Sequence, residues 1–477
     1  MKRGSSPISK NTNRFCSVGT GLALALLGCR ASAATEAEFW LTNPDRSALF
    51  QRQEAPLFFT TKTTNNSPII EVDERQQYQT IDGFGYTLTG GSAMHILRMK
   101  PEARGTLLRD LFATGGTNIG TSYLRVSIGA SDLNDHPFTY DDLPPGETDP
   151  KMAKFSLDPD RSDVIPVLKE ILAINPEIKI LGSPWSAPCW MKTTNDFRGA
   201  SLKPEFYDAY ARYFVKYIQG MKAEGIRIDA ITIQNEPLHP GNNPSMLMLA
   251  PDQAVFIKNH LGPAFRSAQI QTKIILYDHN CDRPDYPISI LNDPEAKKYV
   301  DGSAFHMYRG KIDSLSQVHD AHPDKNLYFT EQWIRAPGNL AKDLRWHVQT
   351  LIIGATRNWS RTVLEWNLAS DPKYEPHTDR GGCDRCLGAV TIDGDKVTRN
   401  PAYYIVAHAA KFLRPGAVRI ASNDLETLPN VAFKAPRGKT VLIVLNSGQS
   451  PQTFNIVWKG KSFISSLNQG AVGTYVW

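Results

Sequence analysis

The sequence has no long hydrophobic run beyond its first 27 residues, and neither sign of charge dominates it. Its formal net charge is +5 over 477 residues, and the basic residues are scattered rather than interleaved with aromatic ones. A nucleic-acid-binding surface would need a concentrated basic patch, and a membrane-spanning helix would need roughly 20 consecutive apolar residues. We therefore expect no nucleic-acid partner and no integral membrane segment in the mature chain.

The sequence signatures of two large enzyme classes are also missing. No G-x-G-x-x-G follows a first strand, which argues against a doubly wound dinucleotide-binding sheet. No G-x-S-x-G is present, which argues against a serine esterase of the α/β-hydrolase type. We therefore expect neither a dinucleotide-binding enzyme nor a serine esterase.

Cysteine is scarce, with six residues in all. Cys383 and Cys386 are spaced as C-x-x-C, so they could close a small loop or contribute to a metal site. A zinc site normally needs a second ligand pair, and there is no second C-x-x-C. We favour a loop disulfide between Cys383 and Cys386 and predict no metal; the pairing of Cys189 and Cys281 stays open.

The N-terminus has the pattern of an export signal over residues 1–33. A basic start precedes a short apolar run, Val18 to Leu27, which is too short for a mature membrane helix. Ala31-Ser32-Ala33 is an A-x-A cleavage site that would release a soluble product. Leu26-Leu27-Gly28-Cys29 resembles a lipobox, in which Cys29 would carry a lipid anchor. We expect an extracellular or periplasmic protein and slightly favour the soluble product.

The rest of the chain divides by its pattern of apolar residues. Residues 34–79 and 411–477 contain short β-prone segments separated by turn residues, such as Val441–Leu445 and Thr453–Val457. We predict that both ends of the chain build one all-β sandwich domain. Residues 80–410 instead alternate short apolar strands with helical stretches, which is typical of a parallel sheet with helices on its faces.

Eight strand candidates lie in this middle region, the number that a (β/α)8 TIM barrel requires. The clearest helix is Glu205–Glu224, with Pro204 in its first turn and Gly225 at its end. An open doubly wound sheet is the structural alternative. The strand candidates are Thr80–Leu88, Thr121–Ile128, Lys179–Ser183, Asp229–Asn235, Lys273–Asp278, Gly302–Met307, Leu327–Thr330 and Thr362–Trp366.

Two glutamates follow predicted strands at the end where a barrel carries its active site. Glu236 leaves the fourth strand and Glu331 the seventh. Either alone could be a turn or salt-bridge residue, but together they match the carboxyl pair that cleaves glycosidic bonds. The neighbouring negative carboxylate should raise the pKa of the acid and so keep it protonated near neutrality. Asn235 is placed to hydrogen-bond a sugar 2-hydroxyl, and no organic cofactor is needed.

Other polar and aromatic residues lie at the same ends of neighbouring strands. Arg125 is placed to hold a carboxylate in its ionised form. Trp185 and Trp366 are each either a platform for a sugar ring or part of the core. His306 is better explained as a hydrogen-bond donor than as a metal ligand, because no second histidine lies at metal spacing. The full set is Arg125, Asp132, Trp185, His306, Tyr308 and Trp366.

Nine segments between about Thr80 and Pro415 carry a resemblance to a known family. They are Asp82–Gly85, Leu124–Val126, Ser183–Pro188, Ala211–Lys216, Asn235–Pro237, Asp293–Ala296, His306–Tyr308, Thr330–Glu331 and Glu365–Ala369. Together they resemble glycoside hydrolase family 30, which contains glucosylceramidases and β-1,6-glucanases. The resemblance implies a retaining enzyme with Glu236 as acid/base and Glu331 as nucleophile. It also implies a barrel fused to a β-sandwich, and a glucose subsite formed by the residues named above.

The residues around the site are more similar to the glucanase branch than to the glucosylceramidases. Thr87–Ala93 differs from the corresponding glucosylceramidase segment, Gln332-Trp333 follows Glu331, and the loop Gly381–Cys386 also resembles the glucanases. We therefore predict a β-glycosidase acting on β-1,6-glucan, with glucosylceramide as the alternative substrate. A β-xylanase or β-galactosidase is a weaker alternative. A protein of another class, a non-catalytic carbohydrate-binding barrel, would leave the two glutamates unexplained.

Overall fold

The computed structural model describes residues 35–61 and 65–477. The predicted signal peptide, Cys29 and both cleavage sites lie outside the described residues. Within the described part of the chain, no helix has the length and apolar character needed to cross a bilayer.

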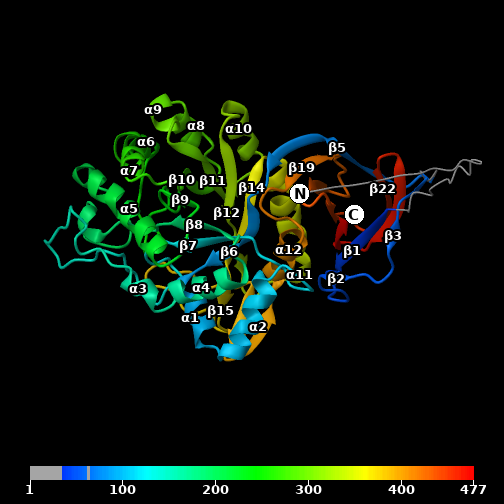
Figure 1. Cartoon of the computed structure of the whole chain (residues 1–477), viewed down its shortest axis with the longest axis horizontal. Coiled ribbons are helices and arrows are strands. Elements are labelled where there is room, and N and C mark those ends of the chain that lie inside the picture. Colours follow the sequence, from blue (N-terminus) through cyan, green and yellow to red (C-terminus); the bar gives the residue numbers. More distant parts are fainter. Residues whose placement is uncertain (1–34, 62–64) are drawn as a thin grey trace, which may run out of the picture. The chain divides into compact units, whose positions relative to one another are not determined.

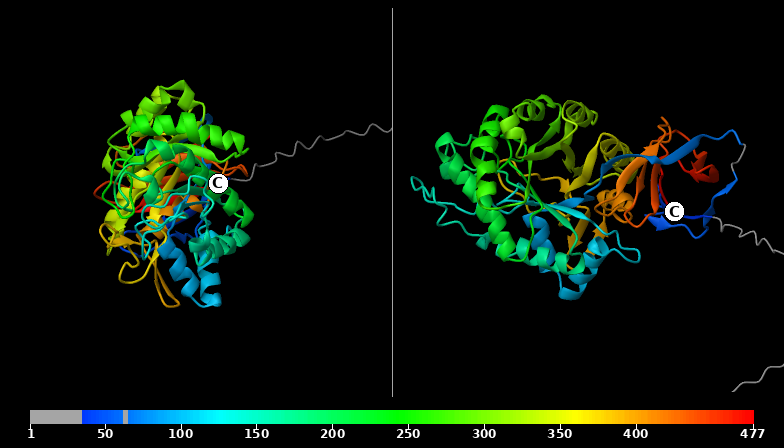
Figure 2. Two further views of the ribbon diagram at one scale, coloured as in Figure 1. Left: turned by 90° about the vertical axis from the view of Figure 1, so that its left-hand side faces the viewer. Right: turned by 45° about the horizontal axis from the view of Figure 1, so that its top comes forward.

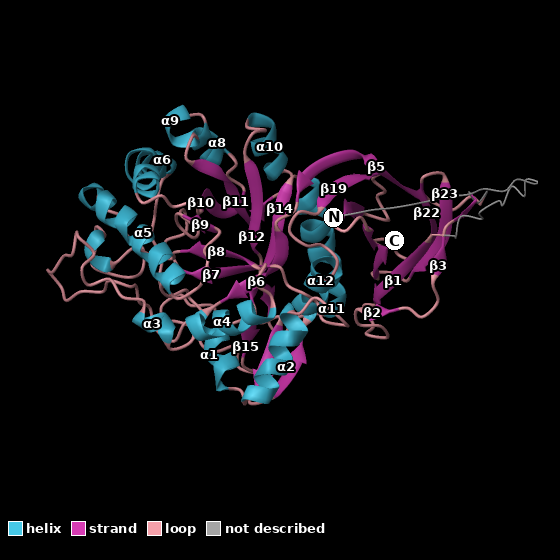
Figure 3. Cartoon of the chain, viewed as in Figure 1, coloured by secondary structure: helices cyan, strands magenta, loops and turns pink. Residues whose placement is uncertain are grey.

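Eight parallel strands close into a barrel, as the sequence predicts, and the open-sheet alternative is wrong (Figures 1 and 3). The strands follow one another around the barrel in chain order, and β14 pairs with β6 to close it. The strands are β6 (Gly83–Leu88), β7 (Tyr123–Ser127), β8 (Lys179–Ser183), β9 (Ala230–Thr232), β10 (Lys273–Cys281), β11 (Val300–Gly310), β12 (Asn326–Glu331) and β14 (Ser360–Asn367).

The interior of the barrel is filled by side chains, so the barrel is a packed core and not a pore. A buried cluster takes one apolar residue from each of seven strands, and this layer forms the floor beneath the polar residues at the strand ends. Its members are Tyr123, Leu181, Ala230, Ile275, Ala304, Tyr328 and Leu364.

Helices surround the barrel (Figure 3). Short 3-10 turns precede or separate some of them, at Cys189–Met191 and Pro204–Phe206, and π-helical turns lie at Ile257–Leu261 and Val348–Ala355. The α-helices are α1 (Gly90–Arg98), α2 (Pro101–Phe112), α3 (Asp158–Arg161), α4 (Val164–Ile174), α5 (Tyr207–Ala223), α6 (Ala250–Phe256), α7 (Gly262–Ser267), α8 (Asp285–Leu291), α9 (Pro294–Lys297), α10 (Ser314–Ala321), α11 (Leu340–His347) and α12 (Pro401–Ala410).

Helix α5 shows why the local sequence forms this layer. Tyr210, Phe214 and Tyr217 recur at three- and four-residue spacing and are buried, which is the apolar stripe of a helix packed on one side. The predicted helix over Glu205–Glu224 begins two residues later, because Pro204 starts a 3-10 turn before it. Gly225 ends it with a φ of 83°, a conformation that glycine adopts without strain.

Strands from both chain ends form the second domain, as predicted. In Figure 2 the blue and red strands lie side by side at one end of the view, and β1 pairs with β24 while β5 pairs with both β19 and β22. The strands are β1 (Glu36–Thr42), β2 (Gln51–Arg52), β3 (Leu57–Phe58), β4 (Thr60–Thr61), β5 (Ile69–Thr80), β19 (Val418–Ser422), β20 (Asn430–Lys434), β21 (Thr440–Leu445), β22 (Gln452–Trp458), β23 (Lys461–Leu467) and β24 (Val472–Val476).

Short strands after β12 and β14 form two further small sheets. β13 (Ile334–Arg335) pairs with β16 (Cys386–Leu387), and β15 (Ala369–Ser370) joins β17 (Val390–Asp393) and β18 (Lys396–Arg399). Because they follow the seventh and eighth barrel strands, these sheets stand at the end of the barrel that carries Glu331 and Trp366.

Candidate active site

A pocket of about 550 Å³ opens where the predicted site residues meet. Glu236, Glu331 and Asn235 line it together with a set of aromatic and polar side chains that includes Asp132, Trp185, Tyr308 and Trp366. Arg125 and His306 are fully buried and contact the two glutamates. The structure therefore brings all the predicted residues together, with Arg125 and His306 supporting the pocket lining.

Glu236 reaches the pocket because the chain leaves the regular ladder early. The predicted fourth strand extended to Asn235, but β9 ends at Thr232. Beyond it, the N–H of Asn235 donates to Pro184 O at 2.8 Å and the N–H of Glu236 donates to Asp278 O at 3.0 Å. Glu236 has a φ of 46°, a left-handed conformation that non-glycine residues adopt at an energetic cost and that is common at functional sites.

Glu331 is the last residue of β12 and faces Glu236 across the pocket. One carboxylate oxygen of each glutamate lies within 4.8 Å of the other. Arg125 Nη1 donates to Glu331 Oε2, and the Tyr308 hydroxyl donates to Glu331 Oε1 at 2.9 Å. Both oxygens of Glu331 therefore accept strong hydrogen bonds, which stabilise the ionised form.

Arg125 orients other parts of the site as well. Its Nη2 donates to Asn235 Oδ1 at 2.7 Å, which orients the Asn235 amide. Its guanidinium lies 4.8 Å from the ring centroid of Trp185, and the Trp185 and Trp366 rings stack at 5.3 Å. Stacking with a cation on the ring face fixes both tryptophans at the edge of the pocket.

Asp278 is a central residue of the site that the sequence reasoning missed. It lies within β10, at an irregularity in the pairing with β11, where its φ is 67°, and it is fully buried. Its Oδ2 accepts from Arg125 Nη2 at 2.8 Å, Ser183 Oγ at 2.8 Å and Thr232 Oγ1 at 2.7 Å. The signal was present in the sequence as Tyr277-Asp278-His279-Asn280, a polar run at the exit of the fifth predicted strand.

Asp278 stays ionised despite its burial. Burial alone would raise its pKa, but the charge of Arg125 and the hydrogen bonds from His306 and Thr330 hold the pKa well below its usual range. Arg125 and Asp278 therefore form a buried ion pair, of a kind that is tolerated only where further hydrogen bonds satisfy both groups.

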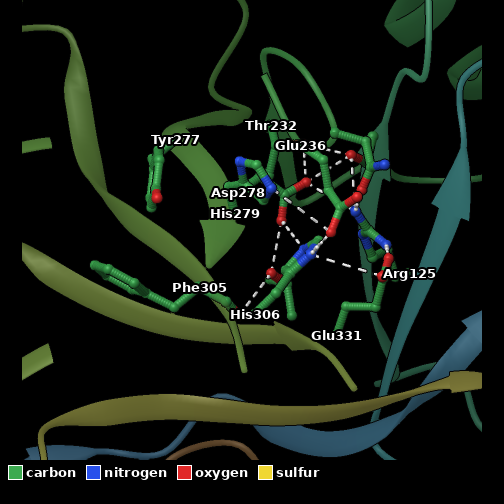
Figure 4. A network of polar contacts seen from close by, with 12 residues as sticks. Arg125, Thr232, Glu236, Tyr277, Asp278, His279, Phe305, His306 and Glu331 are labelled. Atoms are coloured by element: carbon green, nitrogen blue, oxygen red, sulfur yellow. Dashed lines mark hydrogen bonds and ion pairs between the residues drawn. The ribbon is translucent and has the colours of Figure 1, made fainter. Parts of the chain in front are cut away.

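His306 lies between three carboxylates, as Figure 4 shows. Its Nε2 contacts Asp278 Oδ1 at 3.1 Å and its Nδ1 contacts Glu236 Oε1 at 3.1 Å, with Glu331 Oε1 at 3.6 Å. Since Asp278 is ionised, Nε2 must be the donor in the first contact. The second contact then needs one proton of its own, either on Nδ1 or on Glu236.

The charges around His306 determine where that proton rests. Burial would lower the pKa of His306, but the charge of Glu331 and the hydrogen bonds to Asp278 and Glu236 raise it to about 9. The same hydrogen bond and charge of His306 outweigh burial at Glu236 and lower the pKa of its carboxyl. In the free site the shared proton therefore lies on His306.

The expectation that a neighbouring carboxylate raises the pKa of the acid is wrong, because the pKa of Glu236 is lowered. Burial and the negative charges of Glu236 and Asp278 raise the pKa of Glu331 against the opposing effects of His306 and Arg125. The sequence reasoning was wrong for Glu236, because it took no account of a cationic histidine within hydrogen-bonding distance.

Three of these groups also resemble a set of metal ligands. Glu236, His306 and Glu331 each offer one ligand atom within 4.8 Å of the others. The same atoms already take part in hydrogen bonds with Arg125, Tyr308 or one another, and the buried guanidinium opposes a second cation. The arrangement suits a hydrogen-bonded carboxyl pair better than a metal site.

Asp132 and the two loop cysteines complete the pocket. Burial and the charges of Glu331 and Glu236 raise the pKa of Asp132 to about 7, and backbone hydrogen bonds from Asp132 itself and Cys383 act in the opposite direction. Cys383 and Cys386 are joined by a disulfide. Cys189 and Cys281 are free thiols.

Comparison with known families gives matches over both domains. The model described as the glycosyl hydrolase family 30 TIM-barrel domain matches residues 81–413, and the one described as the glycosyl hydrolase family 30 beta sandwich domain matches residues 416–475. Both matches agree with the architecture described above.

Individual relatives match over most of their length. An endo-1,6-β-D-glucanase of Aspergillus fumigatus is 35% identical, over 83% of this chain and 85% of its own. Lysosomal acid glucosylceramidase of Mus musculus is 30% identical, over 87% of this chain and 84% of its own. Among solved structures, the endo-β1,6-glucanase BT3312 is 33% identical with a TM-score of 0.85, covering 93% of this chain and 99% of that one.

Proposed function

This chain belongs to glycosyl hydrolase family 30 and is a glycoside hydrolase, and we propose that it cleaves β-1,6-linked glucan with retention of configuration. The observation that carries the stereochemical part is the gap of at most 4.8 Å between oxygens of Glu236 and Glu331. Retaining enzymes hold their two carboxyl groups about 5 Å apart, whereas inverting enzymes leave room for a water molecule.

In the first step, Glu331 attacks the anomeric carbon and Glu236 protonates the departing glycosidic oxygen. The C–O bond to the leaving sugar breaks, and an ester bond forms between the glucosyl unit and Glu331. Arg125 and Tyr308 donate to the Glu331 oxygens, so they stabilise the anionic nucleophile in its attacking position. The proton comes from the hydrogen bond that Glu236 shares with His306.

In the second step, Glu236 takes a proton from water, and the hydroxide attacks the anomeric carbon from the face that the leaving group occupied. The ester to Glu331 breaks, and β-glucose is released at that chain end. Because Glu331 is then neutralised as an ester, one negative charge near His306 is lost during the intermediate. Once the ester breaks, Glu331 is again an anion and the pair of Glu236 and His306 again holds the proton for the next cleavage, which closes the cycle.

The glucan specificity rests on the relatives. Two endo-1,6-β-glucanases, one matched in sequence and one in structure, share 35% and 33% identity with the chain. Glucosylceramide is the second candidate substrate, because a glucosylceramidase matches 87% of the chain at 30% identity. A hydrolysis panel of β-1,6-glucan, β-1,3-glucan, glucosylceramide and xylan separates these, and preference for any substrate other than β-1,6-glucan would contradict the proposal.

The roles of the two glutamates are tested by chemical rescue on an aryl β-glucoside. Glu331→Gly should lose turnover, and azide should restore it as the α-glucosyl azide, because azide replaces the nucleophile in one inverting step. Glu236→Ala should accumulate the ester and give the β-glucosyl azide. On substrates with poor leaving groups, the turnover rate of Glu236→Ala should fall roughly 10²- to 10⁴-fold.

A matched control is available at another buried glutamate. Glu365 is 1% exposed and bonds His347 Nδ1 at 2.7 Å, away from the pocket lining. Glu365→Gln should give no azide product. If the two variants gave the same anomer, or if Glu365→Gln behaved as they do, the assignment of roles would be wrong.

We also propose that the protein is exported through residues 1–33. N-terminal sequencing or intact mass of the protein from its own host distinguishes cleavage after Ala33 from a lipid on Cys29. A full-length N-terminus retained in the cytoplasm would contradict export.

A further inference from the structure

The disulfide between Cys383 and Cys386 forms part of the pocket wall. Both cysteines line the pocket, while Asp384 and Arg385 between them are exposed. We call residues 383–386 the disulfide turn. Its inner side faces the same cavity as Glu236 and Glu331, so its position affects the space that a bound sugar occupies.

The inner side of the disulfide turn packs against the tryptophans of the site. Cys386 is 4% exposed and clusters with Leu133, Trp185 and Trp366, and Cys383 packs against this cluster. The two tryptophans are the stacked pair that Arg125 holds. A displaced Cys386 would therefore leave one side of the pair without its packing partner.

The disulfide turn also borders Asp132, because Cys383, Cys386 and Asp132 line the same pocket. The backbone of Cys383 lowers the pKa of Asp132, against the larger effects of burial and of the charges of Glu331 and Glu236, which raise it to about 7. The same loop binds the Asp132 backbone, because the N–H of Thr378 donates to Asp132 O at 3.0 Å. Asp132 thus depends on this loop for its placement.

The disulfide turn is attached to the chain near the ends of the two site strands. Cys386 pairs with Arg335 in the small sheet of β13 and β16, and the N–H of Ala336 donates to Arg385 O at 2.9 Å. Asn367 Nδ2 donates to Cys386 O at 3.2 Å. Arg335 and Ala336 lie beyond Glu331 in sequence, and Asn367 is the last residue of β14, so the turn is attached at the ends of both site strands.

We propose that the Cys383–Cys386 disulfide is a positioning element for the sugar-binding wall at Asp132, Trp185 and Trp366. With the bond intact, the short ring holds the Cys383 backbone on Asp132 and Cys386 on the tryptophans. Opening the bond lets the turn move. Substrate binding must then supply the free energy that orders the wall, and this weakens binding. The carboxyl chemistry of Glu236 and Glu331 is unchanged. This inference rests on the proposed glycosidase function.

The direct test is reduction of the folded enzyme with a phosphine reagent, followed by kinetics on a β-1,6-glucan oligosaccharide. Cys189 and Cys281 are already thiols, so the number of newly titratable thiols measures how much of the Cys383–Cys386 bond has been reduced. We expect KM to rise about tenfold while kcat changes less than about twofold, and reoxidation should restore KM. A fully reduced, folded enzyme with unchanged KM would overturn the proposal, as would a loss confined to kcat.

A variant lacking both sulfur atoms provides the second measurement. Cys383→Ala combined with Cys386→Ala should show the raised KM without any reducing agent and should not respond to it. The matched control Arg385→Ala alters the exposed part of the turn, keeps the bond, and should retain the normal KM and its sensitivity to reduction. If both the reduced enzyme and the double variant unfold, the bond is needed for folding, which also overturns a role confined to binding.

The same experiment separates this inference from the proposed function. An oxidised enzyme that hydrolyses no β-glucoside would contradict the proposed function. If the oxidised enzyme is active and its KM is the same after reduction of the disulfide, only the role of the disulfide turn is contradicted.

Discussion

At the scale of single residues, the ring of His306 has carboxylates on both of its nitrogen sides. Glu236 and Glu331 face its Nδ1 side, Asp278 faces Nε2, and the rings of Tyr308 and His279 lie 6.1 and 6.4 Å from its centroid. Burial lowers the pKa of His279 to about 4, so that neighbour is neutral near pH 7. The charge of His306 is therefore set by the three carboxylates, balanced in part by Arg125 on Asp278 and Glu331.

Replacing Asp278 with asparagine tests this arrangement. Asp278 raises the pKa of His306 by hydrogen bond and charge, so Asp278→Asn should lower that pKa. The proton shared with Glu236 would then be lost at lower pH, and the basic limb of the kcat/KM profile should move to lower pH. The measurement is kcat/KM against pH on a substrate with a poor leaving group, whose cleavage needs the proton.

Asp160 provides the control for replacing a buried aspartate elsewhere in the barrel domain. It is 3% exposed and accepts from the Tyr140 hydroxyl, and Asp160→Asn should leave the basic limb in place. A basic limb that stays fixed in Asp278→Asn, or moves to higher pH, would show that Asp278 does not control the proton on His306.

At the scale of elements, the sequence identifies the strands better than their ends. Alternation of apolar strands and helices predicts all eight barrel strands, because burial on both faces imposes an apolar run on each. The pattern could not show that β9 stops at Thr232, since the chain leaves the ladder there through bonds to Pro184 and Asp278, which are distant in sequence. Asp278 was missed for a related reason: its side-chain partners come from five other strands of the barrel.

Helix α5 offers a matched pair of buried tyrosines that differ in their hydrogen bonds. The Tyr210 hydroxyl is buried with no partner among the described residues, whereas the Tyr213 hydroxyl accepts from the N–H of Tyr140 at 3.3 Å. A buried, unpaired hydroxyl costs free energy, and removing one partner of a bond costs more than the bond contributes.

These two positions should therefore respond in opposite ways to loss of the hydroxyl. Tyr210→Phe should leave the free energy of unfolding unchanged or raise it by about 1 kcal/mol, and Tyr213→Phe should lower it by about 1 kcal/mol. Urea unfolding of both variants beside the wild type gives the comparison. If Tyr210→Phe were the less stable of the two, the assignment of these hydroxyls would be incorrect.

At the scale of the whole molecule, one buried cluster spans barrel and sandwich, and the sandwich also has a second core of its own. A single buried cluster includes Trp40 of β1 and Val441 of β21 together with barrel residues. His408 of α12 crosses the same boundary, because its ring contacts Thr42 Oγ1 and Thr474 Oγ1, each at 2.8 Å. The composition of the chain ends predicted the sandwich, but not the side chains that join it to the barrel.

His408 should make the stability of this junction depend on pH. Burial lowers its pKa to about 3, while in the unfolded chain the pKa is about 6.5. Between these values the unfolded chain binds the additional proton, so stability present above about pH 6.5 is lost as the pH falls toward 3.

Replacing His408 with glutamine removes this titration but keeps hydrogen-bonding groups. His408→Gln should therefore lose less stability than the wild type between pH 6.5 and 4, as measured by urea unfolding across that range. The exposed His136, changed to glutamine, serves as the control and should keep the wild-type slope. An unchanged slope in His408→Gln would mean that this histidine does not titrate on unfolding.

The proposed mechanism depends on Glu331 as the nucleophile of a retaining pair with Glu236. A 2-deoxy-2-fluoro-β-glucoside with an activated leaving group slows breakdown of the covalent intermediate, so that it can be isolated. Peptide mass spectrometry of the inactivated enzyme should find the fluoroglucosyl group on Glu331. A label on another residue, or steady turnover without any covalent adduct, would contradict the mechanism.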